Sequence, residues 1–414
     1  MGHLATRPLA QELETNNREI DEVLEHWSAP AGFTRMPPIP AGRYIDPAFF
    51  QLEMKVLKKS WLYGLHDSEL PEPGSWRLLE RLGTPLLFVK QKDGSVKCFL
   101  NVCRHRGNPL VMEKCGKARG FICGAHGWTY HGDGRLAGVR DRKHFHEDDL
   151  RGRNLKEVRC ETLGKLIFFN LDPDTPQSLM DHLGAIGDIW KLYHIDDTRF
   201  VRRDERVIKA NYKVVQEANM EQYHIPNTHP DVLDHYADYK ATATHLFKGG
   251  HSEQITRVKQ QGWDDSRASI PVWPDVEAYS SQLARSFRVF PNMVPIVDAW
   301  GYAISTYWPI DLNTTLFEMV WIGVDAGAAS PELESEWNKM LDSFAYIVDQ
   351  DFQYSERIQQ GLESGACEEL LMGYQEQCIY QAHLELDRRI GRDRIPEGLR
   401  VDRVLEDDDW QSGT

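Results

Sequence analysis

The sequence contains no apolar segment that approaches the roughly 20 residues needed to cross a bilayer. Its N-terminus also lacks the basic-then-apolar order of a secretory signal, so we expect a cytoplasmic protein without a membrane partner. Cysteine is scarce: seven among 414 residues, spread unevenly, do not form a disulfide framework. Basic residues are in deficit, because 48 Lys and Arg face 63 Asp and Glu, for a formal net charge of -15. This balance argues against a nucleic-acid partner, which would need clustered Lys and Arg.

The length predicts about two domains, and the local patterns change twice along the chain. Residues 1–45 combine an acidic amphipathic helix with a Pro/Gly-rich extended segment, which we expect to pack on the C-terminal domain. Residues 46–170 contain short β-like runs such as PLLFVKQ and KLIFFNL, separated by turn signals, and are predicted to be an all-β domain. Residues 171–414 mix helical and strand patterns, which predicts an α+β domain with an antiparallel sheet surrounded by helices.

Two mixed Cys/His pairs lie in the expected all-β domain. Cys103 and His105 form a Cys-x-His pair, and Cys123 and His126 form a Cys-x2-His pair. Thiolate and imidazole together suit zinc or an iron–sulfur cluster. Zinc fingers usually pair Cys with Cys and His with His, whereas each pair here is mixed. Structural zinc and two unrelated pairs are the alternatives, and Cys115 is interpreted as a bystander because it has no matching partner.

The extended pattern, CRHRG followed by CGAHGWTYHGDG, resembles a Rieske [2Fe–2S] site. In such a site two cysteines bind one iron and two histidines bind the other. The resemblance implies that Cys103 and Cys123 hold one iron and that His105 and His126 hold the second. Ala125 stands where relatives often have an aromatic or polar residue, a departure that does not affect a ligand.

A second pair of histidines lies in the segment NYKVVQEANMEQYHIPNTH, residues 211–229. His224 and His229 are five residues apart, so on an unbroken helix they would point about 140° away from each other. Pro226 lies between them and is expected to disrupt the helix and re-aim the second imidazole. Both imidazoles could then converge on one metal, although such a pair is also compatible with a structural role.

Taken together, the patterns are similar to the large (α) subunit of the Rieske non-haem iron oxygenases, the aromatic-ring-hydroxylating family, over roughly residues 45–390. In that family two histidines and one carboxylate bind a mononuclear iron(II). The resemblance therefore assigns His224 and His229 to this iron. The segment DQDFQYSERIQQGLES resembles the family's acidic segment and makes Asp351 the third ligand, with Asp349 and Glu356 as competitors that a charged helix face would also explain.

Two neighbouring positions carry further expectations. Glu221 stands where many ring dioxygenases have Asp, which resembles the carnitine- and choline-type monooxygenases. The resemblance implies that Glu221 binds neither metal and joins His126 of one subunit to His224 of the next in a head-to-tail trimer. Asn219 stands in a region where relatives often have an aromatic residue. It would offer an amide to a polar substrate group if it faces the pocket, and would otherwise be a helix residue turned to solvent.

The family resemblance implies a terminal oxygenase with one [2Fe–2S] cluster and one mononuclear Fe(II) per subunit. It would act on a small-molecule substrate with O2 and with electrons from NAD(P)H, delivered by a ferredoxin or a flavin reductase. A homotrimer is expected, and a β subunit is the open alternative. An aromatic or other hydrophobic ring is the leading substrate, with oxidative N-demethylation or hydroxylation of a quaternary ammonium compound as the alternative. A non-catalytic electron carrier or zinc module is the rival class, which the second histidine pair opposes.

Overall fold

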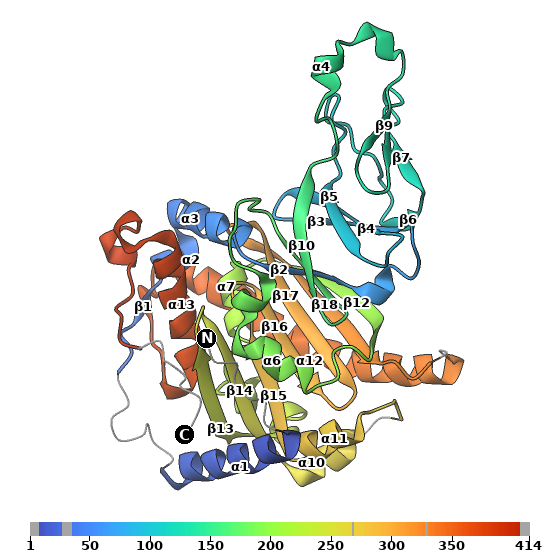
Figure 1. Ribbon diagram of the computed structural model, residues 1–414. Helices are drawn as coiled ribbons and strands as arrows, with labels where there is room; N and C mark the ends of the chain where they lie inside the picture. The colour runs from blue at the N-terminus through green and yellow to red at the C-terminus, as the bar shows by residue number, and fades with distance from the viewer. Residues whose placement is uncertain (1–7, 27–34, 267–268, 328–329, 406–414) are drawn as a thin grey trace. The chain divides into compact units, whose positions relative to one another are not determined.

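The computed structural model describes residues 8–26, 35–266, 269–327 and 330–405. The chain divides into two compact units, a smaller one of Lys58–Leu179 and a larger one of Met1–Leu57 with Met180–Thr414 (Figure 1). Within the described residues, no helix combines the length and the apolar character needed to cross a membrane.

The smaller unit is the expected all-β domain, but both of its ends lie further along the chain than the predicted span of 46–170. At the N-terminal end, α3 (Pro47–Lys58) belongs to the larger unit because Phe49 and Val56 pack against Leu386 and Ile390. At the other end, the indole N–H of Trp61 donates to the carbonyl of Gln177 at 3.0 Å, which ties the segment beyond residue 170 to the β domain.

Two antiparallel sheets build the smaller unit. One has three short strands, in the order β7 (Gly120–Ile122), β8 (Thr129–His131) and β9 (Leu136–Gly138). The other has seven strands, in the order β2 (Leu62–His66), β11 (Leu166–Asn170), β10 (Glu157–Leu163), β5 (Val96–Leu100), β4 (Thr84–Lys90), β3 (Ser75–Arg81) and β6 (Cys115–Lys117). Between β4 and β5 the chain turns at Gly94, whose φ of +87° suits a residue without Cβ. The turn predicted between these two strands is therefore present, and the positive φ of Gly94 allows it.

The larger unit contains one seven-stranded antiparallel sheet (Figure 1). Its order is β12 (Thr198–Ile208), β18 (Thr314–Val324), β17 (Gly301–Asp311), β16 (Met293–Asp298), β15 (Leu283–Arg288), β14 (His251–Val258) and β13 (Ala237–Phe247). Because side chains alternate across a strand, the sheet presents two faces with different neighbours. The predicted α+β architecture is confirmed.

Different helices cover the two faces of this sheet. On one face α1 (Leu9–His26) contacts β13, and α11 (Pro274–Ser280) contacts β15. On the other face α7 (Tyr212–Glu217) contacts β17 and β18, α13 (Gln377–Ile390) contacts β13 and β14, and the ring of Phe352 in α12 (Pro331–Glu363) meets the ring of Phe317 in β18. We call the second side the inner face, because the second histidine pair lies on this side.

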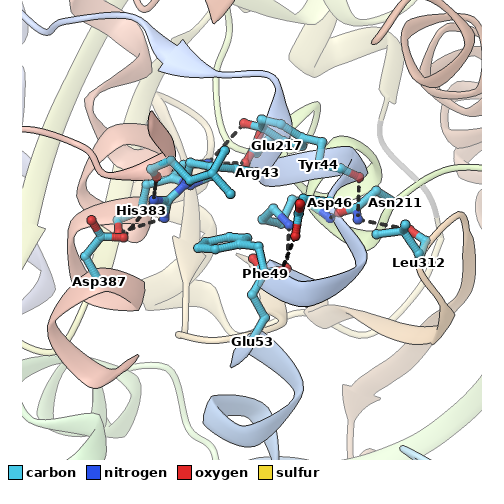
Figure 2. Close-up of polar contacts among 12 residues, drawn as sticks. Arg43, Tyr44, Asp46, Phe49, Glu53, Asn211, Glu217, Leu312, His383 and Asp387 are labelled. Atoms are coloured by element: carbon cyan, nitrogen blue, oxygen red, sulfur yellow. Dashed lines mark hydrogen bonds and ion pairs between the residues drawn. The ribbon is translucent and has the colours of Figure 1, made fainter. Parts of the chain in front are cut away.

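Buried polar contacts tie the segment before α3 to the rest of the larger unit (Figure 2). In α2 (Gly42–Ile45), the fully buried Arg43 donates to Asp387 at 2.7 Å and to the ring of His383 at 2.9 Å. Tyr44 donates its hydroxyl to Glu217 at 2.8 Å. These residues come from α2, α7 and α13, so the network connects three helices that are far apart in the sequence.

A second buried pair lies beside this network. Lys213 of α7 donates to Glu53 of α3 at 2.7 Å, and both side chains are almost fully buried. Burial raises the pKa of Glu53 and lowers the pKa of Lys213, since it disfavours both charges, and the partners' attraction opposes it. The pair therefore depends on both members, because either charge alone would be buried without compensation.

We expect Lys213→Met to reduce the free energy of unfolding by about 3–5 kcal/mol, because it leaves the Glu53 carboxylate unpaired in the interior. Thermal unfolding followed by far-ultraviolet circular dichroism measures the loss. Lys339→Met is the matched control, since Lys339 pairs with Glu336 at the surface and such a pair contributes about 1 kcal/mol or less. The double variant Glu53→Leu/Lys213→Met should recover much of the loss, and a single variant as stable as the control would contradict this account.

Candidate metal centres

The first candidate centre lies in two loops of the smaller unit. Cys103 and His105 follow β5, whereas Cys123 and His126 lie between β7 and β8. Each loop closes on its own cysteine: the N–H of Gly107 donates to the carbonyl of Cys103 at 3.0 Å, and that of Gly127 to the carbonyl of Cys123 at 2.9 Å. Both glycines have a positive φ, +82° and +73°. The glycine in each motif thus allows the loop to turn back tightly.

The four side chains meet around a hollow of about 400 Å³. Both cysteines are buried, and the rings of His105 and His126 have centroids 4.6 Å apart. Among the described residues, Nδ1 of His105 has no hydrogen-bond partner although it is buried. A buried imidazole nitrogen without a partner, beside two buried thiols, fits a metal cluster better than a packed protein interior.

The local electrostatics also suit metal ligands. Burial alone would raise the pKa of the Cys123 thiol, but hydrogen bonds from the backbone N–H of Ala125 and from other neighbours outweigh it and lower the pKa. Burial, followed by the nearby His126, lowers the pKa of His105. Both shifts favour the forms that bind metals, the thiolate and the neutral imidazole.

Three aromatic or cysteine positions complete the description of this centre. Trp128 stacks on His105 with centroids 5.0 Å apart, and the hydroxyl of Tyr130 lies 3.4 Å from Sγ of Cys103. The sequence interpretation gave neither residue a role, although both belong to the quoted motif. Cys115 lies exposed on β6 and does not line the hollow.

The second candidate centre begins where α7 ends. The predicted helical segment stops at Glu217, and a new four-residue helix, α8 (Ile225–Thr228), separates His224 from His229. Pro226 therefore lies in the first turn of a helix, and the expectation that it breaks one was wrong. Its missing N–H costs nothing there, since the first N–H groups of a helix have no intrahelical partner. The two imidazole centroids lie 5.2 Å apart.

Asp351 of α12 completes a group of three potential ligands. Its Oδ1 lies 2.8 Å from Nε2 of His229 and 3.6 Å from Nε2 of His224. One potential ligand atom from each residue lies within 4.8 Å of the other two. His229 is fully buried and Asp351 is 5% exposed. Two imidazoles and one carboxylate on one side of a site match the facial triad that binds iron(II) and leaves positions open.

Outer partners orient both imidazoles. Oε1 of Glu221 lies 2.5 Å from Nδ1 of His224, and the amide oxygen of Gln350 accepts a hydrogen bond from Nδ1 of His229 at 2.8 Å. Because an amide oxygen only accepts, Nδ1 of His229 carries the proton and Nε2 is left with a lone pair for a metal. Burial alone would lower the pKa of His224, but the hydrogen bond and charge of Glu221, with the charge of Asp351, raise it.

The other predicted positions are also placed. Asp349 is exposed and lies 3.8 Å from Arg206, and Glu356 accepts from the backbone N–H of Lys209, so the structure brings neither to the histidines. Asn219 is half-buried and lines a small hollow on the inner face instead of pointing to solvent.

Comparison with known proteins agrees with both centres. Residues 60–157 match the Rieske [2Fe–2S] domain, and residues 195–392 match the catalytic domain of ring-hydroxylating α subunits. The oxygenase subunit of glycine betaine monooxygenase from Pseudomonas aeruginosa (strain UCBPP-PA14) is 32% identical over 370 residues, covering 79% of this chain and 83% of its own.

Two further proteins are similar to this chain, one in part of its sequence and one in its fold. The large oxygenase component of the 2,4-dinitrotoluene dioxygenase system from Burkholderia sp. (strain RASC) is 37% identical over 201 residues, 46% of this chain and 44% of its own. A structure of a quaternary ammonium Rieske monooxygenase superposes with a TM-score of 0.73 at 20% identity, covering 87% of this chain and 97% of that one, which shows a common fold.

We expect Asp351→Ala to weaken binding of the mononuclear iron by more than the roughly 10–100-fold that loss of an outer partner causes. Iron analysis and substrate-dependent turnover measure the effect, while the visible spectrum reports on the separate cluster. Asp349→Ala is the matched control, because it removes an exposed carboxylate from the same helix. If Asp351→Ala kept its iron and Asp349→Ala lost it, Asp349 and not Asp351 would be the third ligand.

Proposed function

The chain belongs to the family of Rieske ring-hydroxylating oxygenase α subunits, and we propose that it acts on a small polar substrate with a methylated ammonium group. As a family member it is an oxidoreductase with a [2Fe–2S] cluster and a mononuclear iron, and NAD(P)H is used through a reductase. When bound, the cluster supplies single electrons and the iron supplies oxygen chemistry; the protein supplies binding and orientation.

The ligand assignment is part of this proposal. The two candidate centres fit these groups in donor type, in burial and in the buried imidazole nitrogen that lacks a partner. The cluster would be held by Cys103, His105, Cys123 and His126, and the mononuclear iron by His224, His229 and Asp351.

The observation that carries the substrate class is the polar lining of the hollow beside Asn219. Ser252 and Gln254 of β14 and Ser286 of β15 line it together with Asn219. Gln254 already bonds to Gln222 and to the carbonyl of Gln375, but the buried hydroxyl of Ser252 has no partner among the described residues. A hydrocarbon ring would leave this hydroxyl unpaired, at a cost of about 1–3 kcal/mol. A polar group of the substrate can satisfy it, so this lining favours the polar quaternary ammonium alternative over the hydrophobic ring that the sequence placed first.

The proposal also covers the assembly. In a head-to-tail homotrimer Glu221 would join His224 to His126 of a neighbouring subunit, and its existing contact with Nδ1 of His224 supports half of this bridge. A charge-assisted hydrogen bond on each side would fix both rings. A ferredoxin or flavin reductase as electron donor and a cytoplasmic location complete the proposal.

The substrate class is tested with purified enzyme and a reconstituted reductase, by oxygen uptake and product analysis. Glycine betaine or a related methylated ammonium compound should be turned over, with kcat/KM at least about 100-fold above that of naphthalene or toluene, because the hydrocarbon leaves the polar lining unpaired. Faster turnover of the hydrocarbons would reverse the substrate assignment and leave the oxygenase assignment intact.

We expect Glu221→Gln to keep both metal centres and a cluster that the reductase still reduces, while product formation falls roughly 10–100-fold. The amide preserves the shape of the side chain but removes the charge that orients His224. Glu334→Gln, an exposed acid at the start of α12, is the control and should change turnover little. Near-normal product formation by Glu221→Gln in a single turnover would remove the bridge from the mechanism.

A further inference from the structure

One buried cation of the larger unit has unused hydrogen-bonding capacity. Arg288 ends β15, is 6% exposed, and donates from Nη1 to the backbone carbonyl of Cys378 at 3.2 Å. Its Nε is buried and has no hydrogen-bond partner among the described residues. Burial lowers the pKa of Arg288 to about 10, which still leaves the guanidinium charged at neutral pH. A buried charge of this kind is costly unless something pairs with it.

Arg288 lies on the inner face, in the wall of the polar hollow. The sheet register places Arg288 opposite Ser252 and Ser286 opposite Gln254, so all four point to the same side. They line the hollow with Asn219. The free volume is about 10 Å³, room for about one water molecule, so an entering group must displace that water or widen the space.

The hollow adjoins the segment that carries the proposed iron ligands. Gln254 accepts a hydrogen bond from the side chain of Gln222 at 3.4 Å, and Gln222 lies two residues before His224. Asn219 comes from the same segment. A substrate group held in the hollow would therefore lie beside the chain that positions the first imidazole.

Arg288 has no ion-pair partner in the part of the chain that the structure describes. No carboxylate of the described residues lies within salt-bridge distance of its guanidinium. Glu253 lines the hollow, but it pairs with Arg285 and with His245, each at 2.7 Å. Glu217 is a more distant counter-charge, and its two oxygens are bonded to Tyr44 and His383.

We propose that Arg288 recognises an anionic group of the substrate, specifically a carboxylate, and thereby selects for zwitterionic or acidic substrates. The inference rests on the proposed oxygenase function and adds the chemical class of the group remote from the reacting atoms. A planar guanidinium matches a carboxylate through parallel N–H donors. Asn219 supplies an amide, and Ser252 and Ser286 supply hydroxyls, to the same space.

Binding to the resting holoenzyme tests the proposal without turnover. Isothermal titration calorimetry compares two matched pairs that differ in the carboxylate: glycine betaine with choline, and benzoate with benzyl alcohol. In the natural protein at least one carboxylate should bind roughly 10–100-fold more tightly than its alcohol partner, as expected for a hydrogen bond to a charged group. Arg288→Gln should abolish this preference and leave binding of the uncharged benzyl alcohol within about threefold, because only the charged interaction is lost.

Arg257→Gln is the matched control. It removes a positive charge from β14, but Arg257 is on the opposite face and pairs with Asp21 of α1 at 2.9 Å, so the preference should persist. The visible spectrum and thermal unfolding show whether Arg288→Gln folds. If it does not, Arg288→Lys, which keeps the charge, replaces it in the test. It should keep part of the preference, since an ammonium lacks the planar fork.

The outcomes separate this proposal from the oxygenase function. If no carboxylate binds more tightly than its alcohol partner, or if Arg288→Gln keeps the preference, Arg288 is a structural cation and the proposal is wrong. Oxygen uptake with a compound that lacks a carboxylate would in that case still support the oxygenase. A preference that Arg288→Gln removes and Arg257→Gln retains supports the proposal, whichever matched pair shows it.

Discussion

The larger unit is organised around the meeting of two imidazoles with the carboxylate of Asp351. His229 and Asp351 are separated by 122 residues and end 2.8 Å apart in the interior. A buried carboxylate is unfavourable without a partner, and a buried imidazole nitrogen is similarly costly when unpaired. Because His229 carries its proton on Nδ1, its Nε2 and Oδ1 of Asp351 face each other as two acceptors, and a metal cation bound here would satisfy both. The meeting requires that α7 end early, that α8 turn between the histidines, and that α12 lie on the inner face.

The outer partners of the two imidazoles differ, and burial gives a reason. His224 is 23% exposed at its side chain and bonds to the carboxylate of Glu221, whereas His229 is fully buried and bonds to the neutral amide of Gln350. A second carboxylate beside His229 would place another negative charge near Asp351, where burial weakens screening. The amide of Gln350 fixes the tautomer of His229 without that cost. The charged partner, Glu221, lies beside the more exposed His224, which is the ring proposed to connect to a neighbouring subunit.

The sequence predicts those parts of the site that local spacing determines. Cys103, His105, Cys123 and His126 were found because each pair lies in one short loop, and the α+β architecture follows from strand and helix patterns. The sequence did not predict the contact between Gln350 and His229. Neighbours on a helix point about 100° apart, so the position of Gln350 next to Asp351 gave no reason to expect this contact. Pro226 was misinterpreted because the same residue can end one helix or start the next, and only the early end of α7 decides between these.

The role proposed for Arg288 could not be predicted from the sequence, because it depends on the register of the sheet. Other buried cations of the larger unit show how Arg288 differs. Arg43, Lys213 and Arg285 each have a carboxylate at 2.7 Å, supplied by another element of the fold. Arg285 and Arg288 are only three residues apart in β15, but alternation turns them to opposite faces, one toward Glu253 and the other toward the polar hollow. Among the described residues, the fold thus pairs these three cations directly and leaves Arg288, beside the polar hollow, with only the more distant charge of Glu217. In the free protein that charge reduces stability, and a bound carboxylate would offset the cost, which is the balance expected of a recognition site.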